Sequence, residues 1–206
     1  MINPKIDLIL REIEKQEEFE QKNPHLIPPS EKVLAIGRDT GMFYNILLQT
    51  IKAKKVLEIG MSTGYSTMWF AEAVSKNDGK IISIDQDEKK INRAKTNFAK
   101  AELTNFVEII HGNALEIISK IKKDHKSFES FDFVFIDADK ERYIHYFDEV
   151  LPLVKKGGLI AADNILFPER FQKFTGPYVE HVKKNPNVRT VTIPIDNGEE
   201  LSLKIS

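Results

Sequence analysis

Acidic residues and glycines lie at the ends of five short apolar runs, and they are the residues best suited to form a binding or catalytic site. The runs are VLEIG (56–60), IISID (81–85), VEIIHG (107–112), FVFID (133–137) and LIAAD (159–163). Together they carry four acids and two glycines at or near their ends: Glu58, Gly60, Asp85, Gly112, Asp137 and Asp163. Parallel strands of an open α/β sheet bind ligands at their carboxyl ends, so these residues are expected to meet at one edge.

The first run continues into a glycine-rich turn, VLEIGMSTGYS at 56–66. Gly60 and Gly64 allow the backbone to turn tightly and to approach a ligand closely. Asp85 ends the next run and is suited to accept hydrogen bonds from ribose hydroxyls. The segment indicates a nucleoside-binding unit, although a turn needed only for packing would also contain glycines.

The spacing of this turn favours a cationic nucleoside ligand. It reads G-x-x-x-G rather than the dinucleotide pattern G-x-G-x-x-G, and Glu58 precedes Gly60 by two positions. A carboxylate would repel a pyrophosphate but attract a sulfonium or an ammonium group. We therefore expect S-adenosylmethionine rather than NAD, and an NAD-dependent oxidoreductase remains an alternative.

Three oxygen ligands follow the last two runs, and they predict a divalent metal site. Asp137, Asp163 and Asn164 suit Mg²⁺, with Ca²⁺ or Mn²⁺ as alternatives. A metal held this way would stabilise the oxyanion of a phenol-like acceptor. Lys140 could take the hydroxyl proton if its surroundings favour the neutral amine. The alternatives are a solvated Lys140, a helix-capping Asp139 and a turn residue at Asn164.

Helical patterns separate the apolar runs, which predicts a parallel α/β sheet with right-handed crossovers. The candidate helices span 65–75, 88–101, 114–123 and 140–154. Near the end, the runs 190–195 and 201–205 flank a polar turn and are typical of an antiparallel hairpin.

The first 54 residues are expected to form a helical N-terminal extension within a single domain of residues 1–206. Ile6, Ile9, Leu10 and Ile13 recur at helical spacing. Ser30 with residues 32–36 could start a short helix, and residues 41–52 predict another.

Composition excludes several kinds of protein. There are no cysteines among the 206 residues, so disulfides, thiolate metal sites and a cysteine nucleophile are excluded. No signal-peptide pattern and no apolar run near the ~20 residues of a membrane span are found, so a cytoplasmic location is expected. A lysine-rich run at 120–126, which includes His125, could serve RNA together with Lys52, Lys54 and Lys55. The net charge of −1 argues mildly against that.

Five segments together resemble the cation-dependent O-methyltransferases, a family that includes catechol and caffeoyl-CoA O-methyltransferases. These are VLEIGMSTGYS, IDQDE, HGNALE, FIDADKERY and GGLIAADN, in the order and spacing of that family. The resemblance covers residues 37–205. It implies a Rossmann-like, seven-stranded, mostly parallel sheet with a reversed C-terminal hairpin, helices on both faces, and a homodimer.

The resemblance also implies roles for individual residues. The donor-binding residues would be Glu58, Gly60 and Met61 on the methionine and ribose side, Ser66 at the carboxylate, Asp85 at the ribose, Asn113 and Ala114 at the adenine, and Asp139 at the amino group. Asp137, Asp163 and Asn164 would hold the metal, with Asp137 also facing the donor. Asp137 and Lys140 would be catalytic.

The sequence departs from the family where the acceptor is expected to bind. Pro168 stands where plant caffeoyl-CoA enzymes tend to have an asparagine, and the segment 169–178 is short, which argues against a plant-type CoA ester. Residues 36–41 also diverge. The expected acceptor is a small catechol-like or hydroxylated aromatic molecule, bound between the N-terminal helices and residues 167–178. The alternatives are a 5-hydroxyuridine-type base of tRNA and a non-catalytic binding module.

Overall fold

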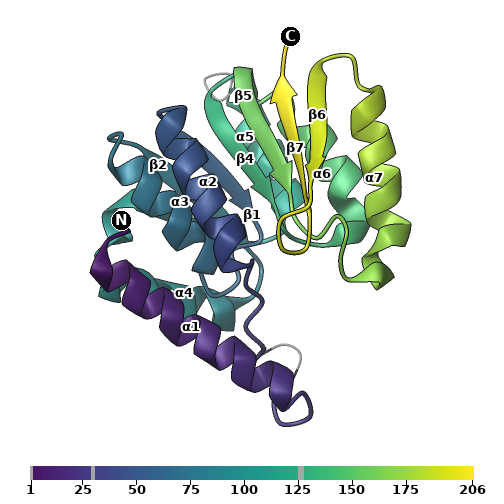
Figure 1. Cartoon of the computed structure of the whole chain (residues 1–206). Coiled ribbons are helices and arrows are strands. Elements are labelled where there is room, and N and C mark those ends of the chain that lie inside the picture. The colour runs from purple at the N-terminus through teal and green to yellow at the C-terminus, as the bar shows by residue number, and fades with distance from the viewer. Residues whose placement is uncertain (1, 29–30, 125–127) are drawn as a thin grey trace.

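A seven-stranded sheet forms the centre of the computed structural model, which describes residues 2–28, 31–124 and 128–206. Its strand order is β3-β2-β1-β4-β5-β7-β6 (Figure 1). The strands are β1 (Lys55–Ile59), β2 (Lys80–Asp85), β3 (Val107–His111), β4 (Phe131–Ile136), β5 (Val154–Ala162), β6 (Val188–Ile193) and β7 (Glu199–Lys204). The first five are parallel, and β7 runs antiparallel to both β5 and β6. The predicted α/β fold with its reversed hairpin is confirmed.

Helices cover both faces of the sheet. They are α1 (Pro4–Lys22), α2 (Arg38–Thr50), α3 (Tyr65–Ser75), α4 (Glu88–Lys100), α5 (Ala114–Lys123), α6 (Tyr143–Val150) and α7 (Gln172–Lys184), with short 3-10 turns η2 (Thr104–Phe106), η4 (Lys140–Arg142) and η5 (Glu169–Phe171). Apolar residues of α1 to α4 share one core with the sheet, and those of α5 to α7 share a second core on the other face.

The central strands β1 and β4 are largely apolar on both sides because both faces are buried there. On β1, Val56 belongs to the first core, whereas Leu57 and Ile59 belong to the second. The N-terminal helix α1 adds its stripe of isoleucines and Leu10 to the first core. In Figure 1, β7 points upward, so the parallel strands end at the lower edge of the sheet, on the side where α1 lies.

Three helix predictions differ from the structure. Residues 32–36 form no helix; this segment instead packs on the molecule, with Val33 and Ile36 buried and the backbone N–H of Val33 donating to Glu20 Oε2 (2.7 Å). Ser30, in the same prediction, lies outside the described residues, as does His125. The helix predicted at 41–52 begins earlier, at Arg38.

The helix predicted at 140–154 is divided into η4 and α6, and it ends at Val150, shortly before β5 begins at Val154. Helix α7 was not predicted. It contains Pro177, which reads as a helix breaker in the sequence, yet Tyr178 and Val182 on the same helix are buried against the second core. No helix within the described residues is long and apolar enough to span a membrane.

Candidate active site

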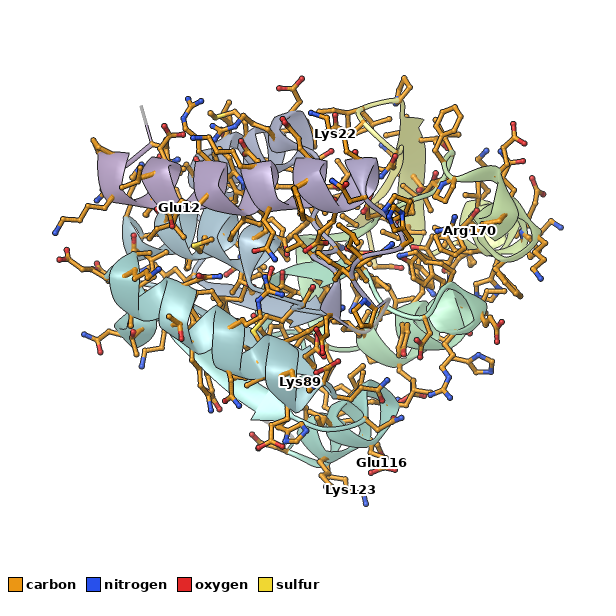
Figure 2. The ribbon with its side chains drawn as sticks, turned by 90° about the horizontal axis from the view of Figure 1, so that it is seen from below. Glu12, Lys22, Lys89, Glu116, Lys123 and Arg170 are labelled. Atoms are coloured by element: carbon orange, nitrogen blue, oxygen red, sulfur yellow. The ribbon has the colours of Figure 1, made fainter. Side chains whose placement is uncertain are left out.

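A cavity of about 590 Å³ opens at the carboxyl ends of the parallel strands. Figure 2 views this side from below and shows Lys89 on the α4 side and Arg170 on the α7 side. Nine of the predicted site residues line the cavity: Gly60, Asp85, Asn113, Ala114, Asp137, Asp139, Lys140, Asp163 and Asn164. Three others, Glu58, Met61 and Ser66, are buried and do not line it.

Gly60 has a backbone conformation and surroundings that require glycine. Its φ is +94°, and a Cβ placed on it would lie 2.0 Å from the carbonyl oxygen of Asp137. The tight approach is held by two backbone bonds of 2.9 Å, from Gly60 N to Ile84 O and from Asp137 N to Ile59 O. The turn after β1 is therefore locked against the ends of β2 and β4.

Asp85 orders the loops on the glycine-turn side of the cavity. Its Oδ2 accepts a hydrogen bond from Ser62 N (2.7 Å), and its Oδ1 accepts one from Asp87 N (2.9 Å). Each carboxylate oxygen keeps a further lone pair for a ligand hydroxyl. On the next strand connection, Asn113 caps α5 by accepting from Leu115 N (3.1 Å) while it lines the same cavity.

Glu58 lies behind the glycine turn and not in the cavity. Its carboxylate accepts hydrogen bonds from Ser66 Oγ (2.5 Å), Thr67 Oγ1 (2.5 Å) and Ser83 Oγ (2.7 Å). Burial raises the pKa of Glu58 to about 7, although the three hydroxyl bonds oppose that shift. Glu58 and Ser66 therefore bond to each other and tie the start of α3 to β1 and β2. The side chain of Glu58 is fully buried.

Asp137, Asp163 and Asn164 line the same cavity as Asp85. Asp163 is only 3% exposed, and burial, followed by repulsion from Asp137, raises its pKa to about 6. Asn164, the residue after Asp163, follows the end of β5 and has a left-handed backbone conformation (φ +61°), as turn residues often do.

This donor set fits a hard divalent cation, because a cation would relieve the repulsion between the two carboxylates. Within residues 2–28, 31–124 and 128–206, no three histidine or carboxylate side chains gather at a metal-binding spacing. The predicted set contains only two carboxylates, and its third member, Asn164, offers an amide oxygen.

Lys140 is held inside the site. Its Nζ donates to Asp137 Oδ1 at 2.6 Å, and its side chain is 8% exposed. The alternative of a solvated surface lysine is therefore wrong. Asp139 makes no capping hydrogen bond to η4, so that alternative is wrong as well; its exposed carboxylate instead faces the cavity and Arg142 (3.8 Å).

Two buried residues behind the acids were missed at the sequence level. Tyr44 of α2 donates a hydrogen bond to Glu199 Oε2 (2.7 Å), and the carboxyl group of Glu199 on β7 lies close enough to Asp163 to shift its pKa. Burial, and then the charge of Asp163, raise the pKa of Glu199 far above its usual range. The sequence pattern places Glu199 in a turn. The one feature that could have indicated its buried position is that this acid directly precedes an alternating apolar run.

The expected acceptor region does line the cavity. Glu17, Leu34 and Ala35 come from α1 and the segment after it, and Pro168, Arg170 and Phe171 come from the segment before α7. The side chain of Leu34 is exposed. The cavity thus joins the glycine turn, the acid cluster and an outer wall formed by these six residues.

Residues 12–205 match the model of a family described as O-methyltransferase. This chain belongs to the O-methyltransferase family. It is 31% identical over 189 residues to caffeoyl-CoA O-methyltransferase 5 of Nicotiana tabacum, covering 84% of this chain and 78% of that protein. The corresponding protein of Petroselinum crispum is 32% identical, with the same coverage of both chains. The resemblance found in the sequence motifs is confirmed.

Solved structures agree with this assignment. An O-methyltransferase from Bacillus cereus in complex with SAH has a TM-score of 0.75 and 27% identity, covering 93% of this chain and 99% of that one. A methyltransferase from Podospora anserina shares the fold, with a TM-score of 0.81 over all of this chain, at 18% identity. The protein is thus a methyltransferase, and the alternatives of an NAD-dependent oxidoreductase and a non-catalytic module are not supported.

Proposed function

We propose that this O-methyltransferase moves the methyl group of S-adenosylmethionine to a hydroxyl oxygen of a small catechol-like or hydroxylated aromatic molecule, with help from a divalent cation. The observation that carries the proposal is that one cavity is lined both by the donor turn and by the pair Asp137 and Asp163. The donor and an acceptor held by the acids would therefore share one space.

The donor half is assigned to the residues around the glycine turn. Asp85 would bind the ribose hydroxyls, Asn113 and Ala114 would contact the adenine, and Asp139 would bind the donor's amino group. Because Ser66 donates a hydrogen bond to Glu58, the two residues would act by stabilising the conformation of the glycine turn. The complex of the Bacillus cereus relative with SAH supports a nucleoside ligand of this kind.

The acceptor hydroxyl would lie beside Asp163, Asn164 and Lys140. A divalent cation bound to Asp137, Asp163 and Asn164 would stabilise the negative charge that develops on the hydroxyl oxygen. That oxygen forms a bond to the methyl carbon as the carbon–sulfur bond breaks, and the sulfonium becomes a neutral thioether. Lys140, whose Nζ lies 2.6 Å from Asp137 Oδ1, would take the hydroxyl proton when its amine is neutral.

The test measures transfer of labelled methyl from S-adenosylmethionine to catechol with and without Mg²⁺. Excess chelator is expected to abolish transfer, and added Mg²⁺ to restore it. The variant Asp163→Asn should lose activity, whereas Asp148→Asn, which alters only a surface pair with His181, should not. Undiminished transfer in chelator would contradict the role of the cation. Bulk undermethylated tRNA, assayed in parallel, tests the alternative acceptor.

We also propose that the protein is a homodimer. Strand β6 is an edge strand, and the face of the β6–β7 hairpin turned away from α7 exposes Val191 (54%) and Leu203 (36%). A twofold pairing would cover the same apolar patch on both copies. Light scattering should give twice the mass of the chain, and Val191→Glu should give the monomer. A monomeric wild type at high concentration would contradict this proposal.

A further inference from the structure

Arg170 is a cation at the mouth of the cavity that has no acidic partner. It lies in η5, is exposed, and lines the cavity. Across residues 2–28, 31–124 and 128–206, its guanidinium makes no ion pair or hydrogen bond. It lies instead over an aromatic ring, with Cζ 4.9 Å from the centroid of Phe171. Stacking leaves the N–H groups of an arginine free to bind a ligand.

The same ring connects Arg170 to the reactive end of the site. Lys140 Nζ lies 5.7 Å from the centroid of Phe171, and Lys140 is bonded to Asp137. Phe171 is partly buried and lines the cavity between these two cations. A planar acceptor with its hydroxyl near Lys140 would therefore contact Phe171 and extend toward Arg170.

The charges around the cavity make Arg170 distinctive. The lining contains six acids: Glu17, Asp85, Asp87, Asp137, Asp139 and Asp163. Of the three cations in the lining, Lys140 is paired with Asp137, and Lys90 belongs to α4 on the donor side. An anionic group would be repelled by most of the cavity wall, and Arg170 is the place on the acceptor side where it would be stabilised.

We propose that Arg170 and Phe171 form a subsite for an anionic substituent of the acceptor, a carboxylate or a phosphate. This inference rests on the proposed function and narrows its substrate class to planar hydroxylated molecules that carry a negative group away from the reacting hydroxyl. Arginine suits this role because its planar fork binds carboxylates and phosphates through two parallel hydrogen bonds.

The test compares 3,4-dihydroxybenzoate with catechol, which differ by one carboxylate. For 3,4-dihydroxybenzoate, Arg170→Gln is expected to raise KM by roughly tenfold, as for loss of one charge-assisted hydrogen bond. The KM for catechol should stay within about twofold, because the neutral molecule has no group for Arg170 to bind. Arg170→Lys should recover part of the loss, since it keeps the charge but not the fork.

Lys173→Gln is the matched control. Lys173 is also an exposed cation over a phenyl ring, with Nζ 4.6 Å from the centroid of Phe174, but it does not line the cavity. It should leave both KM values unchanged. Benzoate and inorganic phosphate, added as inhibitors, test whether the subsite binds a carboxylate or a phosphate. The anion that Arg170 binds should inhibit the wild type more strongly than it inhibits Arg170→Gln.

Calorimetric titration of 3,4-dihydroxybenzoate into protein loaded with SAH and Mg²⁺ separates this inference from the proposed function. If neither acceptor is methylated but the titration shows binding that Arg170→Gln weakens, the proposed function fails and the subsite stands. Equal effects of Arg170→Gln on both acceptors, or no effect on either, would overturn the subsite. Absence of binding to the wild type would overturn it too.

Discussion

The ammonium of Lys140 donates a hydrogen bond of 2.6 Å to Asp137, and the lysine side chain is almost completely buried. Asp137 follows β4 and Lys140 opens η4, so one tight turn brings the two groups together. Lys140 also lies over the ring of Tyr143, with Nζ 5.0 Å from its centroid. The lysine is therefore held at one position, beside the acids that line the cavity.

We predict that Lys140→Met lowers turnover by about a hundredfold or more, the usual effect of removing a positioned acid or base. Affinity for SAH, measured by calorimetry, should fall much less, because the ribose and adenine contacts remain. Lys173→Met serves as the control for a lost cation outside the cavity. A wild-type rate in Lys140→Met would remove Lys140 from the mechanism.

Asp85→Ala should weaken binding of SAH by about tenfold to a hundredfold, as expected for loss of hydrogen bonds to a charged acceptor. The effect has two sources, because Asp85 would bind the ribose and also holds the backbone of Ser62 and Asp87. Asp85→Asn keeps the shape and should lose less. Unchanged calorimetric affinity in Asp85→Ala would contradict the ribose role.

Glu58→Ala should destabilise the fold by about 2–4 kcal/mol, because three buried hydroxyls lose their shared acceptor. Thermal unfolding would report the change as a lower Tm. Glu58→Gln should lose less stability, because the amide oxygen still accepts. If Glu58→Ala kept the wild-type Tm but lost affinity for SAH, direct contact with the donor would replace the structural role.

We predict that the carboxyl group of Glu17 makes the free energy of unfolding depend on pH. Burial, and then repulsion from Glu20 and Glu14, raise its pKa from 4.5 to about 7, against the effect of a backbone bond from Ala35. Since the folded pKa exceeds the unfolded one, ionisation opposes folding, and the stability contributed by the protonated form is lost as pH rises from 4.5 through 7.

Glu17→Gln should therefore be more stable than the wild type at pH 8 and equal to it below pH 4.5, by urea unfolding at each pH. The neighbouring Glu18, whose side chain is 69% exposed, provides the control variant Glu18→Gln, for which no such crossover is expected. A constant difference across this pH range would show that the Glu17 carboxyl is not perturbed.

Much of the fold was predictable because its signals are local. Runs such as FVFID and LIAAD are apolar on both sides, as strands covered by helices must be, and the acids that end them were placed at one edge by the geometry of parallel strands. Asp85, Asp137 and Asp163 therefore reached the cavity as expected. The tight turn at Gly60 was also predicted from the sequence. Its positive φ and its close contact with Asp137 leave no room for another residue type.

The direction of a side chain and the identity of its distant neighbours depend on tertiary packing. Glu58 was expected to face the ligand, but alternation along β1 turns it to the side where Ser66, Thr67 and Ser83 surround it. Helix α7 is continuous through Pro177, and Tyr178 and Val182 on it pack into the second core.

The residues by themselves determined the fold class, the donor turn and the acids of the site, because each depends on spacing within one strand and its following loop. Only the tertiary structure decided that Tyr44 and Glu199 stand behind Asp163, and that Arg170 reaches the cavity. Tyr44 and Glu199 are more than a hundred residues apart in the sequence. Arg170 lies in a 3-10 turn, which has no periodic pattern in the sequence. No local signal encodes these contacts, because they arise when the β6–β7 hairpin and α7 pack against the sheet.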